Sequence, residues 1–236
     1  MAVFVLVPGA WLGGWCWRDV AAHLRSLGHG VIAVTLTGVG ERAHLLDRAI
    51  GLDTHVDDLV GLLNDRDLKD VILVGHSYGG TVITAAAERV PERIARLVYL
   101  DASIPRDGQS NNDVIGPELT MKLRASADAE GEGWRVPPAS RLFENLSDAI
   151  RNWAETRLTP HPLRCFEDRV RLRSPAAAAL PRAFIRTSPR SDLYARLMAH
   201  AREAGWHCRD LEGGHYAMLS EPKAVAAALH ELPGLP

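Results

Sequence analysis

Short apolar runs alternate along this chain with longer stretches in which apolar residues recur at helical spacing. The first run, VFVLV, is apolar on both faces, which is typical of a strand buried in a parallel sheet. We predict strands over residues 3–7, 31–36, 71–74, 97–100, 183–186 and 206–211. Helices are predicted over residues 15–27, 53–63, 79–89, 193–204 and 222–232. This alternation predicts an α/β fold with a doubly wound, mostly parallel sheet and helices on both faces.

Residues from about 103 to 180 break this alternation. Pro, Gly, Asp and Asn are frequent there, and a short helical stretch follows over residues 147–157. The segment is too long to be a simple loop in a compact domain. We therefore predict a single domain, residues 1–236, with a helical cap inserted over about 103–180. The cap should cover the carboxyl ends of the strands, where open α/β sheets bind ligands.

Composition and charge restrict the possible partners and location. The 236 residues are 47% hydrophobic, 24% charged and carry a net charge of −2, which favours a soluble globular domain over one that binds nucleic acid or an anionic membrane. Cys16, Cys165 and Cys208 lie far apart, with neither metal-site nor disulfide spacing. We therefore expect a reducing, cytoplasmic location, with no metal or cofactor.

The motif GHSYGG, residues 75–80, joins the predicted strand 71–74 directly to the predicted helix 79–89. A G-x-S-x-G sequence in this context is typical of a nucleophile elbow, a turn so tight that the serine is strained and its neighbours must be small. Ser77 is then the candidate nucleophile, and Gly75 and Gly79 are the small neighbours. The Tyr78 N–H would lie at a helix N-terminus and point toward a developing oxyanion.

Four segments carry a resemblance that spans nearly the whole chain outside the insertion. They are VLVPGAWLGGWCW (5–17), GHSYGG (75–80), RLVYLDASIPRDGQS (96–110) and LEGGHYAML (211–219). With them the chain resembles the α/β-hydrolase superfamily, and within it the group of plant methylesterases, hydroxynitrile lyases and related bacterial esterases. The resemblance implies a compact hydrolase fold and catalysis by a Ser-His-Asp triad without a cofactor. One departure is Pro8-Gly9, where the family usually has His-Gly.

A catalytic serine needs a base, and in this fold the base comes last in chain order. Four histidines follow residue 186: His200, His207, His215 and His230. His200 and His230 lie within predicted helices and His207 begins a predicted strand. His215 follows two glycines in a loop and matches the family's catalytic histidine, so we predict that it is the base.

Two aspartates are candidates for the acid. Plant relatives carry it two or three positions after a threonine that matches Thr187, but this chain has Pro189 and Arg190 there. Asp192 comes slightly later and also suits the start of a helix. Asp101 ends the apolar strand RLVYLD, and some hydrolases of this fold place their acid at that point. We favour Asp101 over Asp192 and leave the alternative open.

The loop after the first strand is the fold's usual source of a second oxyanion donor. By family match this donor is the Ala10 N–H, with the Tyr78 N–H as its partner, and Gly9 leaves room beside the nucleophile. The related lyases carry Thr at the position of Gly9 and Lys directly after the catalytic histidine, where this chain has Tyr216. The absence of this threonine and this lysine favours acyl transfer to water over carbon–carbon cleavage.

The predicted substrate is a small-to-medium hydrophobic ester or lactone. Gly9, Trp11, Trp134, Phe143, Trp153, Tyr216 and Met218 are the candidate lining residues. Two alternatives remain: a cyclase or lyase that keeps the triad, and a ligand-binding homologue that serves as a receptor. We expect a small molecule as the partner, no nucleic acid or membrane, and a homodimer as one possible assembly.

Overall fold

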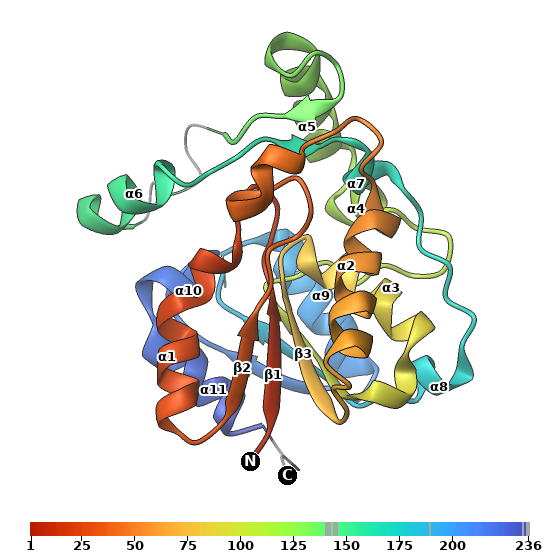
Figure 1. The fold of residues 1–236 in the computed structure, drawn as a ribbon, viewed down its shortest axis with the longest axis vertical. Coiled ribbons are helices and arrows are strands. Elements are labelled where there is room, and N and C mark those ends of the chain that lie inside the picture. The colour runs from red at the N-terminus through yellow and green to blue at the C-terminus, as the bar shows by residue number, and fades with distance from the viewer. Residues whose placement is uncertain (140–142, 144–145, 189, 233, 235–236) are drawn as a thin grey trace.

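A six-stranded, fully parallel sheet forms the centre of the molecule in the computed structural model, which describes residues 1–139, 143, 146–188, 190–232 and 234 (Figure 1). The strand order is β2-β1-β3-β4-β7-β8. The bounds are β1 Val3–Val7, β2 Gly30–Ala33, β3 Val71–His76, β4 Ile94–Leu100, β7 Arg182–Arg186 and β8 His207–Asp210. The structure thus confirms the predicted doubly wound sheet. β2 ends three residues before the predicted strand end, and β4 begins three residues earlier than predicted.

The sheet separates two apolar cores, because successive residues of a strand point to opposite faces. Phe4 and Leu6 of β1 lie in one core with α1 Arg18–Ser26 and α11 Pro222–His230. Val5 and Val7 lie in the other core with α2 Leu52–Asp65, α3 Gly79–Arg89 and α9 Asp192–Glu203. Burying one such side chain stabilises a fold by about 1.5–3 kcal/mol, so both faces anchor β1 and β3 firmly.

The helix predicted over 15–27 consists of two pieces, a 3-10 helix Gly14–Trp17 followed by α1. It ends where predicted, because Gly28 adopts φ +86°, a left-handed conformation that favours glycine. None of the described helices is both long and apolar enough to cross a membrane.

The first part of the segment after β4 lies beyond the carboxyl ends of the strands, toward the top of Figure 1. It contains α4 Asn111–Ile115, α5 Pro117–Glu130, α6 Asp148–Glu155 and α7 Arg164–Glu167. A small antiparallel pair, β5 Arg135–Val136 with β6 His161–Pro162, crosses the same region. The end of β3 and the loops after β1, β4 and β8 therefore lie below α5 and α7. After α7 the chain returns to α8 Pro175–Ala178, which lies beside α3 at the lower right of the figure.

Candidate active site

Ser77 lies at a sharp turn between β3 and α3. Its φ angle is +52°, in the left-handed region that costs a residue other than glycine about 1–3 kcal/mol. Backbone hydrogen bonds hold this conformation: the Ser77 N–H donates to Asp101 O at 3.2 Å and to Leu100 O at 3.4 Å, and Ser77 O accepts from Gly80 N at 3.1 Å and Ser103 N at 3.0 Å. The strain is therefore offset by the neighbouring chain segments, which fix the direction of the side chain.

Two glycines make this turn possible. A Cβ atom on Gly75 would lie 2.6 Å from Gly79 O, and one on Gly79 would lie 2.7 Å from Pro8 O. Both distances are too short for a carbon atom, and both contacts are with backbone, which cannot move aside cheaply. The small residues of the motif are thus required by close packing of the elbow against itself and against the loop after β1.

His215 lies in the loop between β8 and the short helix α10 Ala217–Ser220, and its ring faces Asp101. The ring Nδ1 donates a hydrogen bond of 3.4 Å to Asp101 Oδ2. Two contacts hold this loop: Gly214 N donates to Thr187 O at 2.9 Å, and His76 Nε2 donates to His215 O at 2.8 Å. The Nδ1 contact leaves the Nε2 nitrogen free of a proton when the imidazole is neutral.

Asp101 lies directly after β4 and is fully buried. Its Oδ1 accepts hydrogen bonds from the backbone N–H groups of Thr187 at 2.7 Å and Ser188 at 3.3 Å. Burial alone raises the pKa of this carboxyl group, but the contacts with His215, Ser188 and Thr187 outweigh burial and lower the pKa below its usual value. Asp101 is therefore a carboxylate at neutral pH.

The other candidate acid, Asp192, is exposed in the first turn of α9. A carboxylate at that position interacts favourably with the helix N-terminus, which gives it a structural role. The geometry thus places Asp101 against His215. Pro189, the family's other acid position, lies outside the described residues.

The loop after β1 comes against the elbow, as the oxyanion-hole prediction requires. Ala10 and Tyr78 face the same cavity as Ser77 and His215. The Trp11 N–H is already engaged with His161 Nδ1 at 3.4 Å, and the Ala10 N–H remains the predicted donor of this loop. Trp11 itself has φ +65°, so this loop is strained as well.

The cavity above Ser77 has a volume of about 490 Å³, within the range of small-molecule sites. Its walls are mostly apolar, with a few polar groups near the serine. The lining residues are Ala10, Trp11, Ser77, Tyr78, Ser103, Asn111, Ile115, Leu119, Lys122, Leu123, Ser126, Val136, Pro137, Ala139, Phe166, Ser191, Leu193, Tyr194, His215 and Tyr216.

Comparison with known proteins identifies the family of this fold. The family model described as "Alpha/beta hydrolase family" matches residues 4–228. The chain belongs to the α/β hydrolase family. Among relatives of this hydrolase, a carbendazim hydrolyzing esterase of Nocardioides sp. is 38% identical over 242 residues, covering 98% of this chain and 100% of the relative. The pFDCC methylesterase of Arabidopsis thaliana is 30% identical over 250 residues, covering 96% and 92%.

A solved structure extends the likeness to three dimensions. An extracellular α/β-hydrolase from a Paenibacillus species, which shares structural and functional homology with tobacco salicylic acid binding protein 2, superimposes with a TM-score of 0.86. It is 26% identical to this hydrolase and covers 97% of this chain and 98% of that chain. The predicted superfamily and its compact fold are confirmed.

Several predicted lining residues of this hydrolase lie elsewhere. Met218 is fully buried in the core beside α1, and Phe143 packs against the ring of Tyr216 at 4.7 Å between centroids. Trp153 packs on Trp15 at 5.3 Å, and the Trp134 ring lies near Arg48 and Arg135. The prediction fails for these residues because aromatic and Met side chains fill cores as readily as pockets. Trp11 and Tyr216 do line the cavity.

Gly9 leaves room beside the nucleophile, as predicted, but it is not among the residues that line the cavity. A Cβ atom on Gly9 would lie 2.8 Å from His76 Nδ1 and 2.9 Å from Ser77 Cβ. The residue therefore provides room behind the nucleophile and does not line the cavity. Tyr194, Asn111 and Phe166 line the cavity but were missed, because single residues on helices α9, α4 and α7 carry no motif.

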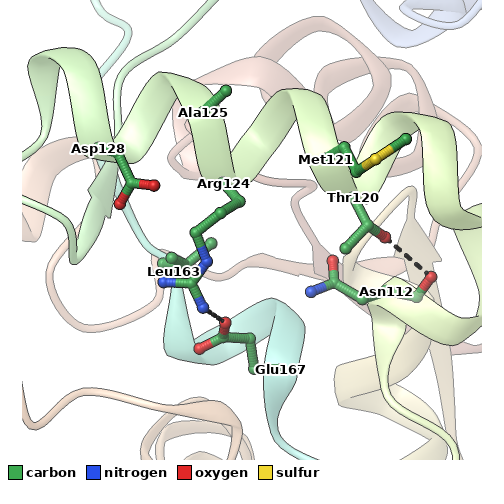
Figure 2. A pocket seen from close by; sticks show the side chains of 8 residues that line it. All are labelled: Asn112, Thr120, Met121, Arg124, Ala125, Asp128, Leu163 and Glu167. Carbon is green, nitrogen blue, oxygen red and sulfur yellow. Dashed lines mark hydrogen bonds and ion pairs between the residues drawn. The ribbon is translucent and has the colours of Figure 1, made fainter.

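A second cavity, of about 350 Å³, lies on the other face of α5 (Figure 2). Arg124 reaches from α5 to an ion pair with Glu167 of α7, and the Thr120 hydroxyl donates to Asn112 O at 3.2 Å. Its lining residues are Asn112, Thr120, Met121, Arg124, Ala125, Asp128, Leu163 and Glu167. These contacts hold the helix whose opposite face, with Leu123, forms a wall of the first cavity.

Behind Tyr78, three buried side chains form a cluster of His55, His161 and Cys165 whose candidate ligand atoms lie within 4.8 Å of one another. His55 Nε2 donates to Thr37 O at 2.9 Å, so its Nδ1 accepts from the Tyr78 hydroxyl at 3.0 Å. The Sγ atom of Cys165 lies 3.7 and 4.0 Å from the two His55 nitrogens. His55 Nδ1 accepts from the Tyr78 hydroxyl and His161 Nδ1 accepts from the Trp11 N–H, so neither histidine has a free nitrogen lone pair, which indicates a structural role for the cluster.

The cluster predicts a pH dependence of stability. Burial lowers the pKa of His55 to about 4, whereas an unfolded histidine titrates near 6.5. Below pH 6.5 the unfolded chain therefore binds a proton that the folded chain does not, so stability should fall as the pH drops from about 6.5 to 4. At roughly 1.4 kcal/mol per pH unit, His55 should account for about 3 kcal/mol. Urea unfolding of the unmodified protein and of H55Q between pH 4 and 7 measures this.

The H55Q variant should lose stability at pH 7 but show a shallower decline toward pH 4. Burial also lowers the pKa of His76 and His161, so part of the slope should remain in the variant. Equal slopes in the two proteins would show that His55 titrates normally in the fold.

Proposed function

We propose that this protein is a serine esterase that cleaves a small-to-medium, mainly apolar ester through an acyl-enzyme. The observation that carries the proposal is the arrangement of Ser77, His215 and Asp101 at the carboxyl end of the sheet. A strained serine and a histidine face one cavity, and a buried carboxylate lies behind the histidine. The full-length relatives named as a carbendazim hydrolyzing esterase and a methylesterase support the same reaction class.

In the first half-reaction, Ser77 Oγ attacks the ester carbonyl and His215 Nε2 takes the hydroxyl proton. Asp101 Oδ2 holds the Nδ1 proton, which fixes the required tautomer and stabilises the imidazolium that forms. The carbonyl oxygen becomes negative and is stabilised by the N–H groups of Ala10 and Tyr78. His215 then returns the proton to the departing alcohol. In the second half, water takes the place of the alcohol and releases the acid.

The loop after β1 favours ester hydrolysis over the chemistry of the related lyases. With a Cβ atom at Gly9 already 2.8 Å from His76 Nδ1, the elbow has no room for the threonine that those lyases carry. Tyr216 follows His215 and is buried against His76 and Phe143, so no cation occupies that position. Lys122 lines the cavity from α5 but pairs with Glu118 at 2.7 Å.

Two measurements on the unmodified protein test the proposal. A fluorophosphonate should add one phosphonyl group, and peptide mass spectrometry should place it on Ser77. Hydrolysis of an aryl acetate, and of the methyl ester of the same acid, in ¹⁸O water should put one solvent oxygen into the released acid. A product without solvent oxygen would indicate a lyase or cyclase. Absence of both labelling and turnover would indicate a binding protein.

A further inference from the structure

We infer that Tyr194 is a second hydrogen-bond donor to the leaving-group oxygen, acting beside His215 during ester cleavage. The inference rests on the proposed function and adds a catalytic residue to it. Tyr194 lies in the first turn of α9, where nothing in the sequence motifs points to it. Its side chain lines the cavity that contains Ser77 and His215.

The hydroxyl of Tyr194 lies beside the predicted base, in the cavity that also contains the predicted nucleophile. Its oxygen is 3.5 Å from His215 Nε2, and Ser77 lines the same cavity. The leaving oxygen must come within hydrogen-bond reach of His215 Nε2 to receive its proton, and it is then only two bonds from Ser77 Oγ. A donor that already contacts His215 Nε2 lies within reach of that oxygen.

The ring of Tyr194 fixes the position of the hydroxyl. It stacks on the His215 imidazole with centroids 5.1 Å apart and planes 20° apart. His76 and Tyr216 also pack against the imidazole, at 4.6 and 5.0 Å between centroids. The imidazole and the phenol therefore keep a fixed relation, and neither ring can swing away when a substrate binds.

Tyr194 keeps its proton throughout the reaction. Burial raises the pKa of its phenol well above the ordinary value, and the negative charge of Asp101 raises it further. When the tetrahedral intermediate collapses, the C–O bond breaks and its electron pair goes to the leaving oxygen. His215 transfers its Nε2 proton to that oxygen, while Tyr194 donates a hydrogen bond and stays neutral.

This role predicts a dependence on the leaving group. Methoxide is a strong base that needs both donors, whereas p-nitrophenolate leaves with little help. For Y194F, kcat/KM for the methyl ester of an acid should fall about 10- to 100-fold, and that for its p-nitrophenyl ester less than about threefold. Tyr99→Phe is the matched control. It removes the buried hydroxyl of Tyr99 in β4, which is hydrogen-bonded to Thr84 Oγ1 of α3 at 2.8 Å, and it should leave the ratio of the two kcat/KM values unchanged.

The outcomes separate the inference from the proposed function. Equal losses on both esters would assign Tyr194 to packing, and no loss on either would remove it from the reaction. No turnover of either ester by the unmodified protein would contradict the proposed function itself. Should Y194F fail to fold, 3,5-difluorotyrosine at position 194 preserves the shape and lowers the phenol pKa. The methyl-ester rate should then decline at a lower alkaline pH than in the unmodified protein, and an unchanged pH profile would overturn the inference.

Discussion

Replacing Ser77 by glycine is expected to lower ester hydrolysis by roughly five to six orders of magnitude while making the protein more stable. The activity is lost because the nucleophile is gone. The stability gain has a different origin: Ser77 is held at φ +52°, where a residue other than glycine pays about 1–3 kcal/mol. Glycine adopts this conformation freely but loses more entropy on folding, by about 0.5–1 kcal/mol. We expect a net gain of about 1 kcal/mol.

Ser77→Ala is the matched control for this result. It removes the same hydroxyl and should lose the same activity, but it keeps a Cβ atom in the left-handed conformation. Its free energy of unfolding in urea should therefore stay within about 0.5 kcal/mol of the unmodified protein. If S77G were no more stable than S77A, the elbow would not be strained. If either variant retained fluorophosphonate labelling, another residue would be the nucleophile.

Replacing Asp101 by asparagine is expected to lower kcat/KM by about three to four orders of magnitude. The backbone N–H groups of Thr187 and Ser188 both donate to Oδ1, so an oxygen must remain at that position. The new amide NH₂ would then face His215 Nδ1, which can only accept. The imidazole proton would move to Nε2, and His215 could no longer take the proton of Ser77.

Asp192→Asn is the control for this variant, because it makes the same chemical change on an exposed helix turn. It should leave kcat/KM within about twofold. Steady-state kinetics on a p-nitrophenyl ester measures both, and ¹H NMR of the imidazole N–H would show the changed tautomer in D101N. A large loss in D192N with little in D101N would make Asp192 the acid.

The architecture was predictable from local patterns, because strands buried on both faces are continuous apolar runs. β1, β3 and the elbow were predicted well for this reason, and α3 has the predicted bounds, 79–89. The edges were less exact. β2 pairs with β1 only as far as Ala33 and Leu6, and after a last backbone bond from Val34 N to Leu6 O at 2.9 Å the apolar pattern continues without a strand.

The candidate lining of the cavity was only partly predictable. Trp11 and Tyr216 were found because they adjoin motifs, whereas Trp134, Trp153 and Met218 were chosen by residue type alone. Residue type does not tell whether a large apolar side chain faces a cavity or fills a core, since burial is favourable in both. The cap helices settle that choice, and their packing depends on contacts between distant segments.

The sequence by itself determined the succession of strands and helices along the chain, the elbow around Ser77 and the loop position of His215, because each depends on neighbouring residues. Only the tertiary structure brought Asp101 rather than Asp192 to His215. It does so because β4 lies between β3 and β7, so that the end of β4 meets the backbone of Thr187 and Ser188. It also placed Tyr194 beside Ser77 and His215, through a packing of α9 against the sheet that no local pattern of residues encodes.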